Sequence, residues 1–174
     1  MKRSAALLAC VFAFYSGLSL SDELEEDDFI AKKWRDSEFS LPAPPVEGGL
    51  AEFQAGVNST NRFFVDLSSL VVTAEGVVRY VLVVDSSAGV RTVSYEGIRC
   101  ESRERRIYAL GRPDGTWVKA RNADWTRIRE TAINRQHAVL YLQYFCPDGI
   151  IVPNADTART LFKRGGYSPY NSLY

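Results

Sequence analysis

The central part of the chain alternates between runs of strand-forming residues and short polar turns. The strand-like runs are 62–72, 76–86, 90–100, 105–111 and 116–120. Glycine, proline, aspartate and serine occupy the short connections between these runs, which is typical of tight turns. The run 76–86 is almost continuously apolar, which predicts a central strand covered on both faces. The pattern therefore predicts an antiparallel meander of about five strands.

The hydrophobic period changes after residue 134. Apolar side chains at positions 138, 139, 142 and 145 have the spacing of an amphipathic helix, and Pro147 and Gly149 end it. Asn154 is suited to cap a last short helix that runs through Phe162. The expected fold class is α+β, with the C-terminal helix packed on the sheet. The alternative is a helix that lies across the sheet edge.

The first residues have the pattern of a secretory signal peptide. Lys2 and Arg3 precede an apolar stretch at 5–20, which is short for a membrane span. Ser19 and Ser21 place small side chains at the −3 and −1 positions, so we expect export and cleavage near Ser21. An uncleaved anchor is the alternative. The segment Leu7–Cys10 is similar to a lipoprotein box, but the apolar run continues beyond it, which disfavours lipidation of Cys10.

The remaining chain divides into three parts by composition. Residues 22–61 are a leader, acidic at 22–28 and proline-rich at 41–45. Its apolar residues are too many for a free linker, so we expect it to be strapped to the domain. Residues 62–164 form a single domain, and 165–174 are expected to be a disordered tail.

Charge narrows the classes of partner. Without Lys2 and Arg3 the mature chain holds 19 basic and 21 acidic residues, a net charge of −2. Six of the acids lie in 22–28, and the rest of the chain is mildly basic. This acidic run is more typical of a solvated leader than of a segment folded onto an arginine-rich face. The small basic excess and the lack of a recognition motif exclude a nucleic-acid partner.

Cleavage would leave two cysteines, Cys100 and Cys146. In an exported chain an even count predicts a disulfide, which here staples the end of a strand to the end of the helix. A redox role is disfavoured because the cysteines are not closely spaced. Two cysteines and one distant histidine fall short of a metal site, and no cofactor motif is present.

Candidate binding residues are polar side chains within the apolar strand patterns and at the helix start. They are Arg62, Arg79, Tyr95, Glu96, Arg99, Asn134, Arg135 and His137. Charges in strand patterns are costly unless paired or exposed, and arginine is suited to carboxylates and phosphates. Some of these residues are expected to line a groove between helix and sheet that binds an anionic group or a peptide end. The alternative is an internal pair of Glu96 with an arginine, among ordinary surface arginines.

Several stretches of the chain are similar to one known family. They are NRFFVD (61–66), GVVRYVLVV (76–84), SYEGIRC (94–100), ERRIYALGRPDGTW (104–117) and INRQHAVLYLQYFCP (133–147), with W…LPAPP (34–45) before them. These stretches resemble the cryptic-neisserial-protein-like family of exported proteins from Gram-negative bacteria. The resemblance implies a single-domain periplasmic or envelope protein. It implies no reaction, because that family has no known function.

The function expected from the sequence is that of a periplasmic binding or accessory domain. Its partner would be an envelope protein or peptide, bound through an edge strand or through the groove, and no membrane span would remain after cleavage. Two alternatives stay open: an enzyme that uses His137 as a general base, and a carrier that holds a small ligand between sheet and helix. No catalytic residue is assigned, since no nucleophile motif accompanies the histidine.

Overall fold

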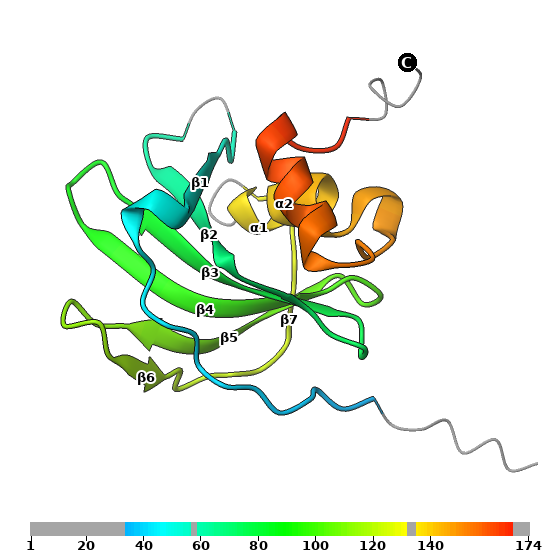
Figure 1. Ribbon diagram of the computed structural model, residues 1–174, viewed down its shortest axis with the longest axis horizontal. Helices are drawn as coiled ribbons and strands as arrows, with labels where there is room; N and C mark the ends of the chain where they lie inside the picture. The colour runs from blue at the N-terminus through cyan, green and yellow to red at the C-terminus, as the bar shows by residue number, and fades with distance from the viewer. Residues whose placement is uncertain (1–33, 57–58, 132–134, 169–174) are drawn as a thin grey trace, which may run out of the picture. The chain divides into compact units, whose positions relative to one another are not determined.

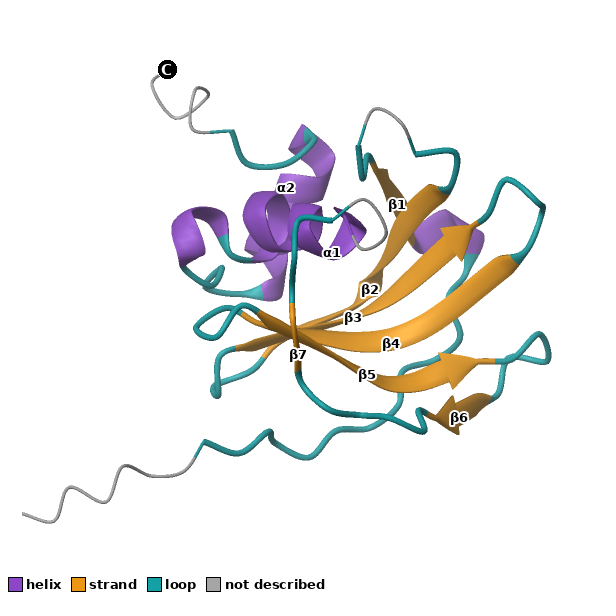
Figure 2. Ribbon diagram, turned by 180° about the vertical axis from the view of Figure 1, so that it is seen from behind, coloured by secondary structure: helices purple, strands orange, loops and turns teal. Residues whose placement is uncertain are grey.

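The computed structural model describes residues 34–56, 59–131 and 135–168 (Figure 1). The signal peptide, the acidic run and positions 169–174 of the tail lie outside the described residues. In the part that is described, one antiparallel sheet carries helices on one face (Figure 2).

The sheet is a meander in which each strand pairs with the next one along the chain. Its order is β1-β2-β3-β4-β5-β6, and β7 pairs with β5 beside β6. The bounds are β1 Leu50–Phe53, β2 Arg62–Val72, β3 Val77–Asp85, β4 Arg91–Arg99, β5 Glu104–Gly111, β6 Trp117–Lys119 and β7 Thr126–Arg127, with a 3₁₀ turn η1 at Glu47–Gly49 before β1. The predicted α+β meander is confirmed, and it has two more strands than expected.

The two additional strands come from segments that the pattern did not identify. Leu50–Phe53, expected in the leader, pairs with β2, and its Phe53 is buried 5.9 Å from the ring of Phe63. Thr126–Arg127 is only two residues long and pairs with Glu104 and Arg105. Strands this short carry too little period-two pattern to be predicted, and tertiary pairing alone defines them.

Strand β3 is covered on both faces, as its apolar run predicted. On one face Tyr80 and Leu82 join the main core beneath the helices. On the other face Val81 and Val83 join a smaller core with Tyr95. The segment 34–45 runs along this second face, opposite the helices (Figure 1); we name it the strap.

The C-terminal helical layer differs from the predicted regular helix. Helix α1, Arg135–Val139, continues into a π-helix, η3, at Leu140–Phe145, and a 3₁₀ turn, η4, follows at Pro147–Gly149. The predicted apolar face is wrong at Leu142, which is 39% exposed, while Tyr141 and Tyr144 are buried. A π-helix turns more widely than an α-helix, with i to i+5 bonds such as that from Cys146 N–H to the Tyr141 carbonyl, 2.8 Å. The buried set is therefore shifted along the sequence.

Helix α2, Ala155–Arg164, begins as predicted. The Asn154 side chain caps it by accepting a hydrogen bond from Thr157 N–H at 2.9 Å. Gly165, with φ of 80°, ends the helix in the left-handed conformation. The following Tyr167 donates its N–H to the Gln143 carbonyl at 2.7 Å, so the start of the expected disordered tail is in fact hydrogen-bonded.

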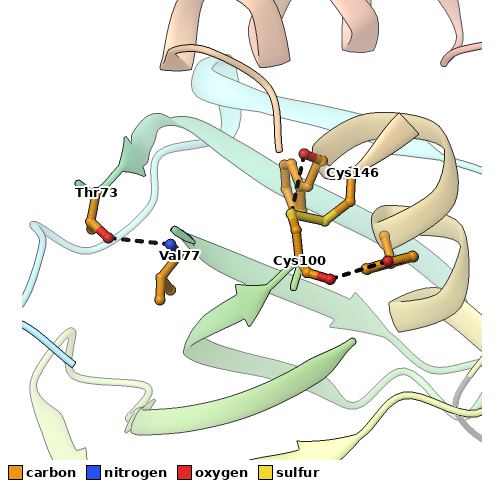
Figure 3. Close-up of a disulfide and its surroundings, with 6 residues drawn as sticks. Thr73, Val77, Cys100 and Cys146 are labelled. Atoms are coloured by element: carbon orange, nitrogen blue, oxygen red, sulfur yellow. Dashed lines mark hydrogen bonds between the residues drawn. A yellow bond between two sulfur atoms is a disulfide. The ribbon is translucent and has the colours of Figure 1, made fainter. Parts of the chain in front are cut away.

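The predicted disulfide joins Cys100 and Cys146, with 5.6 Å between their Cα atoms (Figure 3). Both cysteines are buried. The Tyr141 hydroxyl donates to the Cys100 carbonyl at 3.2 Å, which adds a second tie between sheet and helix. Figure 3 also shows Thr73, whose Oγ1 accepts from Val77 N–H at 3.3 Å in the turn before β3. The staple therefore anchors the π-helix to the end of β4.

Candidate functional site

Alternation along the strands divides the predicted candidates between the two faces of the sheet. Residues Tyr80 and Glu96 are register partners on β3 and β4, and both lie on the helix side. Their chain neighbours Arg79 and Tyr95 lie on the strap side. Because successive side chains point to opposite faces, the candidates on these two strands do not share one face. Of these candidates only Glu96 lies on the helix side, where a groove between helix and sheet was predicted.

The strap contacts Arg79, one of the predicted binding residues. Arg79 is 4% exposed and donates to the Asp36 carboxylate at 2.6 Å. The same guanidinium donates to the carbonyls of Ser37, at 2.6 Å, and Glu38, at 3.3 Å. Asp36 also accepts from the Tyr108 hydroxyl at 2.7 Å. Burial is the largest influence and lowers the pKa of Arg79, but the interactions with Asp36 and Tyr108 together outweigh it, so its pKa is raised. Arg79 therefore holds the strap.

Two further candidates also serve the strap. Tyr95 lies 5.8 Å from Phe39, measured between ring centroids. The guanidinium of Arg99 lies over the ring of Trp34 at 4.1 Å and pairs with Glu101 at 2.6 Å. Stacking of this kind stabilises the strap against the sheet.

The helix face holds a buried cluster around one carboxylate. The Glu96 carboxylate accepts from Tyr80 Oη at 3.1 Å and from Ser94 Oγ at 2.7 Å. The third contact joins its Oε2 to His137 Nε2 at 2.8 Å. Glu96 is 3% exposed and His137 4%. The internal partner of Glu96 is thus a histidine rather than the arginine of the alternative prediction.

The protonation of this cluster follows from its contacts. Burial alone would raise the pKa of Glu96, but the proximity of His137 and the hydrogen bonds from His137 and Ser94 outweigh it, so the pKa is lowered. Burial, followed by the negative charge of Glu96, raises the pKa of Tyr80 well above its ordinary value. At neutral pH the carboxylate is therefore ionised and Tyr80 stays a hydrogen-bond donor.

His137 also borders a small pocket near the edge formed by β5 and β7. The pocket measures about 200 Å³ and is lined by Arg105, Thr126, Arg127, Ile128, Arg129, Thr131 and His137. We call it the arginine pocket. Pairing of β7 with β5 places Arg127 beside Glu104 and so close to Arg105. Buried Ile128, whose N–H donates to the Arg103 carbonyl at 2.9 Å, fixes the segment that carries Arg127 and Arg129.

The three arginines of this pocket differ from most others in the described part of the chain. None of Arg105, Arg127 and Arg129 forms a salt bridge with a described residue, whereas Arg62 pairs with Glu52 at 2.8 Å. Arg105 acts electrostatically on the carboxyl of Glu96, and Glu104 lies opposite Arg127 in the pairing of β5 with β7. The pocket thus concentrates positive charge.

Sequence reasoning identified His137 and missed the arginines beside it. The signal was present in Thr126–Arg127–Ile128–Arg129, where one buried apolar residue lies between two arginines. The segment is too short to stand out among other polar loops. Of the remaining candidates, Arg62 lies on β2 in its pair with Glu52, Arg135 packs beside Gly56, and Asn134 lies outside the described residues.

Within 34–56, 59–131 and 135–168, no group of three or more histidine, cysteine and acidic side chains is placed to hold a metal ion. No helix in these ranges has the length and apolar character needed to cross a membrane.

Comparison with known proteins gives one match. No curated protein matches the chain, and no solved structure matches it. The model of one family, described as the CNP1-like family, matches residues 30–163, which include the strap, the sheet, both cysteines and the arginine pocket. That family has no known function. The chain therefore belongs to the CNP1-like family.

Proposed function

We propose that this protein is an exported binding or accessory domain of the bacterial envelope that takes an anionic group in the arginine pocket. The observation that supports it most directly is the gathering of Arg105, Arg127 and Arg129 around one small pocket, without carboxylate partners among the described residues. Guanidinium groups are suited to carboxylate and phosphate oxygens. The signal-peptide pattern of the first 21 residues supports export.

Binding of a partner by strand addition at a sheet edge has less structural support than binding in the arginine pocket. The strands at the sheet edges are short, with four residues in β1, three in β6 and two in β7. Short edge strands are a common way to prevent pairing with another chain. The arginine pocket is therefore the better candidate than an added strand.

A carrier function has less support. Tyr80 and Phe145 are fully buried between sheet and helices, with 4.9 Å between their ring centroids. A ligand in this layer would have to displace core side chains, which costs packing energy.

The Glu96–His137 pair is the one observation that favours an enzyme. A carboxylate that orients a histidine is an arrangement found in general base catalysis. Here, however, the hydrogen-bonded Nε2 faces the carboxylate, and both side chains are more than nine-tenths buried. The pair is better placed to hold the pocket wall than to reach a substrate from solvent.

Thermal unfolding in a panel of anions tests the binding function. Phosphate, citrate and acetate should raise the melting temperature relative to chloride at equal ionic strength, since a ligand that binds only the folded state stabilises it. The double variant Arg127→Ala/Arg129→Ala should lose this effect, and Arg121→Ala, an exposed arginine outside the pocket, should keep it. Equal stabilisation of all three proteins would contradict the proposal.

Export is tested separately. The mature chain should appear in the periplasmic fraction and begin at Asp22 on N-terminal sequencing. An intact Met1 would contradict cleavage, and lipid attached to Cys10 would contradict the interpretation of the Leu7–Cys10 segment.

A further inference from the structure

The strap lies on the sheet without joining it. Residues 34–45 form no helix or strand, and all of them are exposed or half-buried. The hydrogen bonds between the strap and the sheet involve side chains, as from Arg79 to the Ser37 carbonyl at 2.6 Å and from Trp117 Nε1–H to the Pro42 carbonyl at 2.8 Å. An extended peptide docked on the surface of a preformed domain makes contacts of this kind.

The surface beneath the strap is built by the sheet alone. Tyr95 and Tyr108 belong to the smaller core, whose buried members all come from strands β2 to β5. Trp117 of β6 packs against this core, and the Arg79 guanidinium lies 5.5 Å from the centroid of the Tyr108 ring. We name these four residues the strap face. Because none of them comes from the strap, the face should keep its shape when the strap is displaced.

The strap face has partners for three features that are evenly spaced along the strap. The Asp36 carboxylate accepts from the Arg79 guanidinium at 2.6 Å and from the Tyr108 hydroxyl at 2.7 Å. The Phe39 ring lies 4.5 Å from that of Tyr108, measured between centroids, and the Pro42 carbonyl accepts the indole N–H described above. Steps of three residues match the turn of a polyproline II helix, the conformation in which aromatic-lined surfaces bind proline-rich peptides.

The strap does not fill the space beside this face. A cavity of about 340 Å³ lies next to its proline end, with Pro44 and Pro45 of the strap and Val83 and Val93 of the sheet among its lining residues. Its volume falls within the roughly 300–1,000 Å³ of ligand sites. Phe39 itself stays 41% exposed. A segment with a larger apolar side chain at the proline end would therefore bury more apolar surface than the strap does.

We infer that the strap face binds an extended segment of a partner protein, and that the strap is its intramolecular occupant. The partner's segment carries a carboxylate, an aromatic ring and a proline at the spacing of the strap, followed by a large apolar side chain that enters the cavity. Charge supports this class of partner, because Arg79 and Arg106 both contact the Asp36 carboxylate, the occupant's one contribution of negative charge. The inference goes beyond the proposed function and does not depend on the arginine pocket, since Glu96 and His137 meet on the other face of the sheet.

Nuclear magnetic resonance of the isotope-labelled mature protein, titrated with an unlabelled peptide of residues 34–45, tests whether the strap can be displaced. A tethered segment has an effective concentration of about 1 mM, so peptide at roughly that concentration should release half of the strap. The Phe39 amide signal of the protein should then move to a disordered position. No release at about 10 mM peptide, ten times the effective concentration, would overturn the inference.

Weakening the protein's own strap should tighten binding of the peptide. Asp36→Ala leaves the strap face intact, so the indole signal of Trp117 should report binding at least about tenfold tighter than in the wild type. Phe39→Ala is the second variant, because it leaves no buried charge unpaired. Glu38→Ala, at an exposed residue that bonds to Arg79 through its carbonyl, should match the wild type. Unchanged affinity in both Asp36→Ala and Phe39→Ala would overturn the inference.

Paired variants test what the face recognises. The protein variant Asp36→Ala/Arg79→Met should bind the peptide at least about tenfold more weakly than Asp36→Ala, since it lacks the guanidinium that holds the carboxylate. The change Pro45→Trp in the peptide should tighten binding about fivefold as the larger ring enters the cavity. Equal affinity in the first pair would overturn recognition of the carboxylate, and in the second pair the role of the cavity. Circular dichroism confirms folding of each protein variant.

Sedimentation of the wild-type protein identifies the source of the occupant. A monomer whose strap the peptide displaces supports a partner protein. A dimer that the peptide dissociates would place the strap of a second copy on the strap face and would overturn the assignment to a different protein.

Discussion

At the scale of single residues, contacts to the strap and the buried Glu96–His137 pair meet at one irregular point in the pairing of β4 with β5. Tyr108 is the extra residue of a bulge, because Tyr95 pairs with Ala109 and the next residue, Glu96, pairs with Ile107. The bulge presents the Tyr108 ring toward Gly97. On the opposite face of β4, Glu96 contacts His137. One short section of β4 thus serves both the strap and the arginine pocket.

The lowered pKa of Glu96 makes stability depend on pH. A carboxyl whose pKa is lower in the folded protein binds fewer protons there than in the unfolded chain, so its stabilisation is complete above the unfolded value of about 4.3. This stabilisation is lost as the pH falls through the folded pKa. Urea unfolding between pH 7 and pH 3 should show a steeper loss for the wild type than for Glu96→Gln. Parallel curves would contradict the assignment, and Glu101→Gln, at a side chain 80% exposed, is the control.

Gly97 is expected to tolerate no side chain. A Cβ atom there would lie 2.7 Å from Tyr108 Oη and 2.9 Å from Tyr108 Cε2. Gly97→Ala should lower the free energy of unfolding by about 1–3 kcal/mol, the usual cost of overpacking. Gly48→Ala, where nothing lies within 4 Å of the added atom, should change it little. Denaturant titration of both variants measures the difference.

At the scale of elements, some features could be predicted from local sequence pattern, whereas others depend on tertiary contacts. The four long strands β2 to β5, the short β6, the α2 cap and the two-sided burial of β3 could be predicted because each has a local signature: a strand pattern between turn residues, Asn154 as N-cap, or an unbroken apolar run. The π-helix could not, because its i to i+5 bonding shifts which residues are buried without changing the composition. The arginine pocket could not be predicted either. It depends on the pairing of β7 with β5, a contact between segments about twenty residues apart, which no local sequence pattern indicates.

The strap should depend strongly on its buried ion pair. Asp36→Ala leaves the Arg79 guanidinium, 4% exposed, without its carboxylate, and breaking such a pair typically costs about 3–5 kcal/mol. Removal of the exposed Asp156, whose side chain is 89% exposed in its pair with Arg159, should cost at most about 1 kcal/mol.

A second variant separates loss of the pair from loss of strap packing. In Asp36→Ala/Arg79→Met no buried charge is left uncompensated, so much of the stability should return. If chemical denaturation shows the double variant to be as unstable as Asp36→Ala, strap packing rather than the charge pair would hold this face.

The disulfide should stabilise the fold without defining it. It closes a loop with a sequence separation of 46 residues, and the chain-entropy model gives about 4 kcal/mol for a loop of this size. Reductant, or Cys100→Ser/Cys146→Ser, should lower the melting temperature while far-ultraviolet circular dichroism keeps its shape. A melting temperature unaffected by reductant would contradict this prediction.

At the scale of the whole molecule, one sheet is covered by two different layers. Helices, tied to the sheet by the disulfide, cover one face, and an irregular strap covers the other (Figures 1 and 2). The helix side contains the larger core. The strap side depends instead on a buried ion pair, on packed aromatic rings and on hydrogen bonds such as Trp117 Nε1–H to the Pro42 carbonyl at 2.8 Å. The two layers should therefore open independently.

Hydrogen exchange should resolve this difference. Amides of β3, at the centre of the sheet, should exchange most slowly, because both faces and both edges of the strand are covered. Those of β6 and β7, at the edge, should exchange fastest among the strands. Exchange of β3 at the rate of β6 would show that the strap layer does not protect the sheet.

The strap also constrains the order of folding. Its partners lie far along the chain: Trp34 bonds to Glu75, Asp36 to Arg79 and Tyr108, and the Pro42 carbonyl to Trp117. Contacts this distant carry a large loop-closure entropy and form late. The earliest segment of the described chain is thus the last able to dock, since its platform is incomplete until β5 and β6 have paired. Until then the aromatic surface of Tyr95 and Tyr108 stays uncovered, and transiently exposed apolar surface of this kind is where a folding chain is most prone to aggregate.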